Sequence, residues 1–157
     1  MKKIVLLFIS LFLIQINLYS LNNNDLFFKD FISRSWNAQD GIPGNTITDI
    51  MQSSNGYIYF GTYGGLVRFD GLNFTVLNQN YNSDFAFRST RVVVQDKRGN
   101  LWVGSNDEGV FCIKTDGQVI SFSTENGLTN NSVRAICEDF ENNIWVGTAS
   151  GINVISD

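Results

Sequence analysis

The chain has 157 residues, of which 43% are hydrophobic and 17% charged, and its net charge at pH 7 is −4. It contains no histidine, which removes the most frequent general base and the commonest metal ligand together. The acidic balance provides no basic surface for nucleic acid or an anionic membrane, so neither is expected as a partner.

The N-terminus has the features of an export signal. Lys2 and Lys3 precede an apolar run from Ile4 to Ile14, and Ser20 supplies a small residue at a polar exit. This pattern predicts a secretory signal peptide over residues 1–20, with an uncleaved membrane anchor as the alternative. Either outcome places the rest of the chain on the periplasmic or extracellular side of a bacterial membrane.

A strand is predicted over residues 28–36, before the main body of the chain. Trp36 aligns with Phe122 at a spacing of 86 residues, and each precedes a polar-Gly-apolar triplet. The segment therefore corresponds to an outermost strand, which belongs to a preceding or a closing blade.

An internal repeat dominates residues 21–157. The pattern aromatic-apolar-Gly-(Ser/Thr) recurs at a period of 43 residues, at 59–62, 102–105 and 145–148. Residues 88–105 and 131–148 are identical at seven of 18 aligned positions. A period of this length is typical of β-propeller blades, and the repeats cover about 37–79, 80–122 and 123–157.

Each repeat divides into short β-type runs separated by Gly, Asn and Asp turn signals. The expected strands are 46–52, 56–62, 66–69 and 74–77, then 89–95, 100–105, 110–114 and 119–123, then 132–138, 143–148 and 152–155. This predicts an all-β chain with no helix after the signal region. Its fold is a partial β-propeller of three four-stranded antiparallel repeats, the last represented by three runs.

The second run of each repeat is apolar on both faces, as expected for a blade between two neighbours. The structural repeat positions are Tyr59, Gly61, Trp102, Gly104, Trp145 and Gly147. We expect the aromatic rings to be buried, and each glycine to allow close approach of a neighbouring backbone or of the aromatic ring. Replacing either tryptophan by alanine is expected to cost about 3 to 5 kcal/mol.

Two cysteines, Cys112 and Cys137, lie in a chain predicted to be exported, where a disulfide is permitted. Met51 and Val94 occupy the position of Cys137 in the other repeats. This favours a buried apolar role for Cys137 over a bridge.

No group of residues predicts catalysis, a metal site or a cofactor. The carboxylates Asp49, Asp96, Glu138 and Asp139 recur at strand ends, where capping of turns is favoured over paired acid and base work. The Asp-Gly pairs at 70–71 and 116–117 do not match a calcium loop.

A ligand site, if present, is expected where the fourth-to-first and second-to-third strand loops gather, around the channel mouth. The candidate contacts are Asn45, Arg88, Asn131, Tyr63, Asn106 and Asp107. These residues also suit a structural role, because polar groups at strand starts cap the backbone. Tyr63, Asn106 and Ala149 differ at one equivalent position, so repeated identical sugar sites are not expected.

The segments 41–47, 56–62 and 98–105 resemble the two-component regulator propeller repeat. The resemblance covers everything from Trp36 onward. It implies the N-terminal part of an exported sensor propeller, belonging to a histidine kinase or diguanylate cyclase receptor, with a small molecule or glycan as ligand.

The chain departs from that family pattern in having three repeats, fewer than the about four to eight blades that close a ring. A fragment of a sensor without an output domain is favoured over a short protein that self-associates. The alternatives are a lectin-like or structural propeller, and an enzyme fragment of the propeller lyase or quinoprotein type. Further blades or a second copy are the expected partners.

Overall fold

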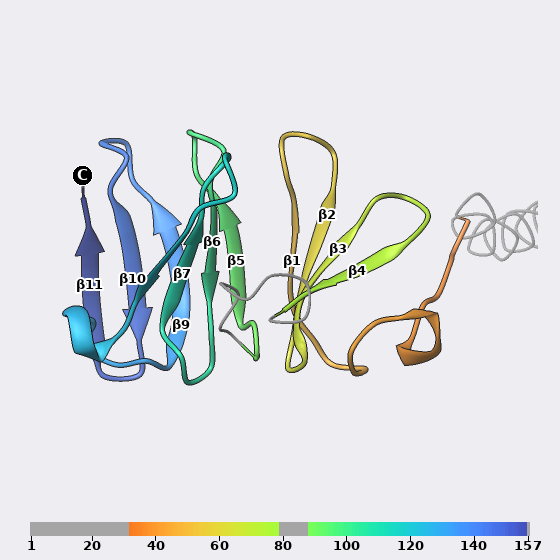
Figure 1. Ribbon diagram of the computed structural model, residues 1–157, viewed down its shortest axis with the longest axis horizontal. Helices are drawn as coiled ribbons and strands as arrows, with labels where there is room; N and C mark the ends of the chain where they lie inside the picture. The colour runs from red at the N-terminus through yellow and green to blue at the C-terminus, as the bar shows by residue number, and fades with distance from the viewer. Residues whose placement is uncertain (1–31, 79–87, 157) are drawn as a thin grey trace, which may run out of the picture. The chain divides into compact units, whose positions relative to one another are not determined.

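The computed structural model describes residues 32–78 and 88–156, which form three antiparallel sheets (Figure 1). The strands are β1 (Ile47–Gln52), β2 (Ile58–Thr62), β3 (Gly65–Phe69), β4 (Phe74–Leu77), β5 (Val92–Gln95), β6 (Leu101–Gly104), β7 (Val110–Ile113), β8 (Val119–Phe122), β9 (Val133–Glu138), β10 (Ile144–Thr148) and β11 (Gly151–Ile155). We call β1–β4 blade 1, β5–β8 blade 2 and β9–β11 blade 3. Each is a meander in chain order, which confirms the all-β propeller-type fold.

The tight turns explain why the strands end where they do. Gly99 has a φ of 89° between β5 and β6, a conformation that side chains with a Cβ rarely adopt. Asn142 takes the equivalent place in blade 3 with a φ of 68°. Asparagine is the residue that best tolerates this left-handed conformation after glycine, so the same hairpin forms from a different residue.

Two 3₁₀ turns, η1 (Ala38–Asp40) and η2 (Thr124–Asn126), lead into blades 1 and 3, where the sequence predicted no helix. The side chain of Asn37 accepts a hydrogen bond from the N–H of Gln39, and Asp40 accepts one from the N–H of Asn37. Ser123 and Asn126 repeat this capping box at η2. Such a box closes a single turn without hydrophobic periodicity, which is why the strand patterns did not reveal it.

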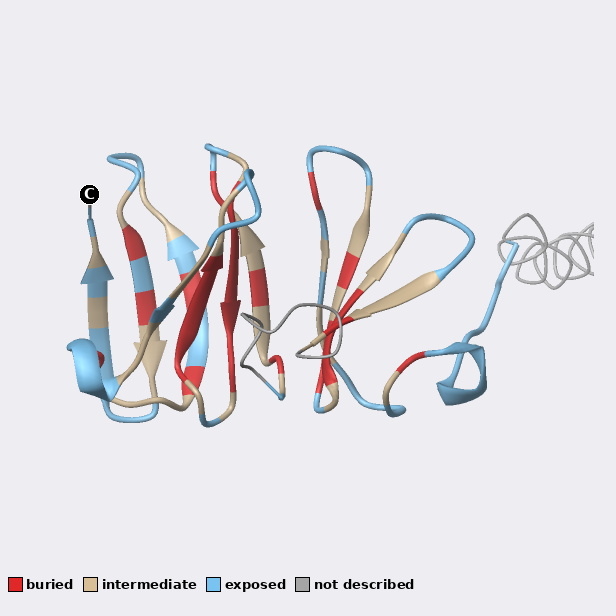
Figure 2. Cartoon of the chain, viewed as in Figure 1, coloured by how far each residue is buried: buried red, intermediate tan, exposed pale blue. Residues whose placement is uncertain are grey.

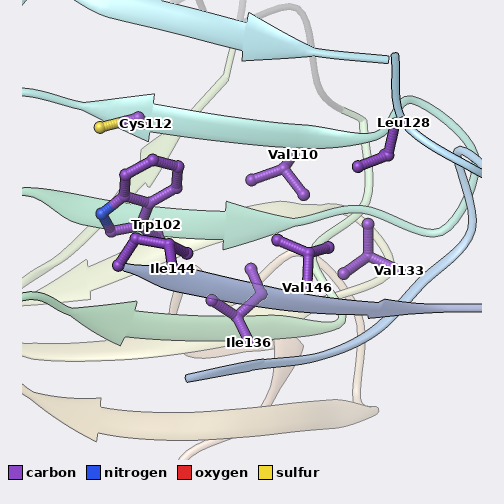
Figure 3. Close-up of a cluster of buried hydrophobic side chains, with 8 residues drawn as sticks. All are labelled: Trp102, Val110, Cys112, Leu128, Val133, Ile136, Ile144 and Val146. Atoms are coloured by element: carbon purple, nitrogen blue, oxygen red, sulfur yellow. The ribbon is translucent and has the colours of Figure 1, made fainter. Parts of the chain in front are cut away.

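The hydrophobic core lies between the blades (Figure 2). One cluster joins blades 1 and 2: Tyr59, Leu66, Leu77, Val93, Leu101, Val103 and Phe111. A second joins blades 2 and 3: Trp102, Val110, Cys112, Leu128, Val133, Ile136, Ile144 and Val146 (Figure 3). Blade 2 is therefore covered on both faces, which accounts for the loss of alternation in its strands.

The repeated aromatic position is buried in two blades and exposed in the third. Tyr59 and Trp102 are each 6% exposed, whereas Trp145 is 41% exposed. The expectation that Trp145 is buried between neighbours is therefore wrong for this chain. Its ring lies on the face of blade 3 that points away from blade 2. No further blade among the described residues covers that face.

The repeated glycines show the same division. A Cβ on Gly61 would lie 2.5 Å from the hydroxyl oxygen of Thr48. One on Gly104 would lie 2.5 Å from Val133 of blade 3, so at both glycines it is a neighbouring side chain that approaches closely, where the sequence led us to expect a backbone or the aromatic ring. A Cβ on Gly147 would make only ordinary contacts, the nearest at 3.7 Å to Ala135, because no neighbour presses on it.

The cysteines are both free. Cys112 is buried in the core between blades 2 and 3, whereas Cys137 is exposed on the same face as Trp145. The prediction of a buried slot for Cys137 is wrong here, although its counterparts Met51 and Val94 pack against the two core clusters. The difference again follows from the neighbour that covers those counterparts.

The signal peptide predicted over residues 1–20 lies outside the described residues, as do residues 28–31. Residues 32–36 form no strand, so the strand predicted over 28–36 is not seen in its described part. A strand there would need an edge of another blade to pair with. Trp36 instead packs on Phe69 and Phe74 of blade 1, with ring centroids 5.4 and 6.0 Å away.

Candidate functional site

One end of the blades collects the loops that enter each first strand and the loops between second and third strands. We call it the loop end; the hairpin turns before β2, β4, β6, β8 and β10 lie at the opposite, turn end (Figure 1). The antiparallel meander places all six candidate contacts at the loop end: Asn45, Tyr63, Arg88, Asn106, Asp107 and Asn131.

Asn45 and Asn131 hold the chain as it enters a blade. The side-chain oxygen of Asn45 accepts a hydrogen bond from the N–H of Ala38 at 3.2 Å. That of Asn131 accepts from the N–H of Thr124 at 2.8 Å. Both oxygens thus stabilise a 3₁₀ turn, the structural role that the sequence left open for these residues.

The remaining candidates have their side chains directed more freely to solvent. Tyr63 is 55% exposed in the β2–β3 loop, and Arg88 and Asp107 are exposed. The side-chain amide of Asn106 donates a hydrogen bond to the carboxylate of Asp107 at 2.8 Å. A phenol, a guanidinium and a carboxylate at one end of the fold provide both donors and acceptors.

At the turn end, two carboxylates repeat one network. Asp96 accepts hydrogen bonds from the Asn100 side chain at 2.8 Å and from the Trp102 indole at 2.9 Å. Asp139 does the same with Asn143 and Trp145, at 2.9 and 2.8 Å. The acid therefore closes the hairpin and fixes the indole ring, which supports the capping role over acid and base work.

Both carboxylates stay ionised at neutral pH. Burial raises the pKa of Asp96, but the hydrogen bonds from Trp102 and Asn100 outweigh it and leave the pKa below its usual value. The hydrogen bonds from Trp145 and Asn143 lower the pKa of Asp139 to about 2. A carboxylate that remains charged in this range is a poor general acid.

The other two carboxylates bridge blades. Asp49 of blade 1 accepts from the N–H of Val93 in blade 2 at 2.8 Å. Glu138 of blade 3 accepts from the N–H of Lys97 in blade 2 at 3.0 Å. Both carboxylates thus join neighbouring sheets. The sequence analysis did not predict these contacts. The recurrence of Gln52, Gln95 and Glu138 at 43-residue spacing could have indicated the contact made by Glu138.

Clefts open between the blades at the turn end. One of about 300 Å³ lies between blades 1 and 2, and one of about 150 Å³ lies between blades 2 and 3. The second is lined by charged groups, among them Asp96, Arg98, Lys114 and Glu138. None of the six loop-end candidates lines either cleft.

Within residues 32–78 and 88–156, no three Cys, Asp or Glu side chains gather closely enough to hold a metal ion. In the same part of the chain, no helix has the length and apolar character needed to cross a membrane.

Three segments match a known repeat. Residues 41–64, 85–107 and 127–150 fit the family described as two component regulator propeller. The matches contain the three aromatic-apolar-Gly-(Ser/Thr) motifs and the loop-end residues that precede them.

A histidine kinase of Formosa agariphila is 32% identical over 85 residues, which are 50% of this chain and 6% of the relative. Among solved structures, the extracellular domain assigned to a hybrid two-component system of B. thetaiotaomicron has a TM-score of 0.69 and 24% identity, over 79% of this chain and 17% of that one.

PorZ, a surface component of the type-IX secretion system of Porphyromonas gingivalis, has a TM-score of 0.55 and 18% identity, over 71% of this chain and 17% of PorZ. A streptogramin B lyase has a TM-score of 0.54 and 14% identity, over 73% of this chain and 41% of the lyase. Structural likeness at these identities shows the fold alone. The chain spans a small part of the relatives' length.

Proposed function

The chain carries three two-component regulator propeller repeats, and from that premise we propose that it is an extracytoplasmic, ligand-sensing segment of a two-component-type signalling receptor. The observation that carries the proposal is the coincidence of the three matched segments with the three blades. The similarity to part of a histidine kinase supports it. Export, through the apolar N-terminus, belongs to the same proposal.

The ligand-binding surface in this proposal is the loop end. The side-chain oxygens of Asn45 and Asn131 already accept hydrogen bonds from the 3₁₀ turns. The proposed ligand contacts are therefore Tyr63, Arg88 and Asp107. An exposed aromatic ring at the same end of the fold as donors and acceptors suits a sugar, whose C–H face packs on the ring while its hydroxyls form hydrogen bonds. We take an oligosaccharide as the ligand class.

The test is a titration of the full chain with a panel of neutral and acidic oligosaccharides, followed by calorimetry. For an oligosaccharide that binds, Tyr63→Ala and Arg88→Ala should each weaken binding about tenfold, equal to about 1.4 kcal/mol. Leu72→Ala is the matched control, because Leu72 is an exposed apolar residue at the turn end and should leave binding unchanged. A panel without a binder, or equal losses in all three variants, would contradict the proposal.

An enzyme is the weaker alternative. The likeness to the streptogramin B lyase is one of fold, and the recurrent carboxylates of the described residues are occupied in hairpins and between blades. The proposed role is therefore binding without catalysis. A structural propeller that self-associates is compatible with the exposed faces of the end blades.

A further inference from the structure

The two clefts at the turn end lie at equivalent places between successive blades but differ in charge. We call the cleft between blades 1 and 2 the first cleft, and the cleft between blades 2 and 3 the second cleft. Counterparts 43 residues apart line them: Ser53 and Gln95 in the first, and Asp96 and Glu138 in the second. The first cleft therefore has neutral side chains at two places where the second has carboxylates.

The first cleft has no acidic lining. No Asp or Glu is among the described residues that line it, whereas Lys114 lines it from blade 2. In the second cleft, Arg98 and Lys114 are balanced by Asp96 and Glu138. The chain as a whole has a net charge of −4, so a cleft without a carboxylate differs from the rest of the molecule. This composition favours an anion as the occupant.

Arg68 adds a cation beside the first cleft. It pairs with Tyr59 across β2 and β3, so it lies on the face of blade 1 that carries Tyr59 into the cleft. Its guanidinium carbon lies 4.8 Å from the centroid of the Tyr57 ring. In blade 2 the corresponding partner of Trp102 is Cys112, which lines the second cleft. A guanidinium thus takes the place that an apolar thiol has in the next blade.

The guanidinium of Arg68 has no acceptor among the described residues. Its Nε is buried and forms no hydrogen bond, and no described carboxylate forms an ion pair with it. Asp70 and Asp116, in the neighbouring β3–β4 and β7–β8 turns, accept hydrogen bonds from backbone N–H groups of their own turns. A charged group that loses water without gaining a partner is costly. An anion that enters the cleft would supply that partner.

The remaining lining of the first cleft suits hydroxyl groups. Ser54, Asn55 and Thr115 are exposed and contribute two hydroxyls and a side-chain amide. Tyr59 and Leu101 provide apolar contact beside them. The volume of about 300 Å³ is at the small end of ligand pockets, which range from about 300 to 1,000 Å³. The cleft therefore suits a ligand of the size of a monosaccharide.

We propose that the first cleft binds a small carboxylate that carries hydroxyl groups, such as a sugar acid, with Arg68 as the partner of the carboxylate. The planar guanidinium presents parallel N–H groups that match the two oxygens of a carboxylate. The site is formed by blades 1 and 2, each of which has four strands. It is separate from the loop-end site, none of whose six candidate residues lines it, and it does not rest on the sensing function.

The first experiment titrates the full chain with glucuronate and follows the assigned backbone amide resonances by NMR. Glucuronate should shift the amides of Ser54, Gly99 and Thr115, which line the first cleft. Glucose, which lacks the carboxylate, and inorganic phosphate should each bind about tenfold more weakly or less. Glucuronate that shifts no cleft amide, or glucose or phosphate that binds as tightly, would overturn the proposal. Shifts confined to loop-end amides would also overturn it, while supporting the sensing site.

Two variants of Arg68 test its role. Arg68→Gln should weaken glucuronate binding about 10- to 100-fold, because it removes a charge-assisted hydrogen bond. Arg68→Lys should restore only part of the binding, because an ammonium is a point charge without the planar fork. Tyr63→Ala at the loop end is the control and should leave binding in the cleft unchanged. Thermal melting verifies that each variant is folded, and unchanged binding by Arg68→Gln would contradict the assignment.

A variant that leaves Arg68 in place tests the charge of the cleft. Gln95→Glu introduces the carboxylate that the second cleft has at Glu138, and it should weaken glucuronate binding about tenfold through repulsion. The blades tolerate this residue, because Glu138 accepts the same kind of inter-blade hydrogen bond as Gln95.

Gln52→Glu is the matched control for Gln95→Glu. Both glutamines donate a side-chain hydrogen bond to the carbonyl of the glycine four residues later. Gln52, however, pairs with Ile58 on the face of blade 1 opposite to Tyr59, so its replacement should leave binding unchanged. Equal losses in the two variants would show an effect of total charge and would overturn the assignment of the site to the first cleft.

Discussion

Blades 2 and 3 contain the same hairpin, yet one is covered by neighbours and the other is half open. Asp96, Asn100 and Trp102 in blade 2 form the same hydrogen-bond network as Asp139, Asn143 and Trp145 in blade 3. Trp102 is nevertheless buried and Trp145 is largely accessible. The network is thus formed by residues of the repeat itself, whereas burial of the ring depends on whether a neighbouring blade covers it.

This division is typical of repeat proteins, in which the stability of each unit and the interface between units are separate contributions. Within blades 2 and 3 an aspartate accepts the indole N–H, and in blade 2 Trp102 also stacks on Phe122 of β8 at a centroid distance of 5.8 Å. Between blades, Trp102 packs with the aliphatic residues of blade 3. The same substitution should therefore have different effects at the two positions.

The largest difference is expected for the tryptophans. Trp102→Ala should lower the free energy of unfolding by about 3 to 5 kcal/mol, because it leaves a cavity between blades 2 and 3. Trp145→Ala should cost about 1 kcal/mol, since the ring is partly exposed and loses one hydrogen bond. Chemical denaturation of dilute, monomeric protein measures both. Equal losses would show that Trp145 is covered in solution, contrary to its exposure here.

A smaller difference is expected for the glycines. Gly104→Ala would place a methyl group 2.5 Å from Val133 and 2.6 Å from Val92, so it should cost about 1 to 3 kcal/mol. Gly147→Ala meets no such contact and should remain within about 0.5 kcal/mol of the parent in the monomer. Denaturation curves of the two variants test this. A comparable loss for Gly147→Ala would indicate that a neighbour presses on blade 3.

The sequence predicted the blades because their signals are local and periodic. The 43-residue spacing and the turn residues predicted the strands of the three blades and the repeated aromatic and glycine positions. The exposure of Trp145 and Cys137 could not be predicted in this way, because burial depends on which segment lies opposite. The 3₁₀ turns were also not predicted, because a capping box such as that of Ser123 and Asn126 has no hydrophobic periodicity.

The location of the loop-end residues could be predicted from the sequence, but their hydrogen bonds could not. Topology puts Asn45, Tyr63, Arg88 and Asn131 at one end of the blades once the meander is known. Only the structure shows that the oxygens of Asn45 and Asn131 hold backbone N–H groups. A side chain's local hydrogen bond is set by loop geometry, which spacing in the sequence does not determine.

The smallest expected effect is a change in the pH dependence of stability when the hairpin network of blade 3 is altered. The pKa of Asp139 is lowered from the ordinary 3.8 to about 2 by hydrogen bonds from Trp145 and Asn143, and it remains lowered although the blade is open. A folded-state pKa below the unfolded one adds stability that is fully present above about pH 4, and that stability is lost as the pH falls toward 2. Asp139→Asn should therefore reduce the stability at pH 6 and flatten the decline in stability between pH 4 and 2. Some decline should remain, because Asp96 and Asp70 also have lowered pKa values.

Denaturant midpoints from pH 2 to pH 6 measure the change, with Asp107→Asn at the loop end as the control for the loss of one negative charge. Parallel pH profiles for the parent and Asp139→Asn would mean that the network of Asp139 is not formed in the open blade, and that a covering neighbour is needed to assemble the hairpin as well as to bury its ring.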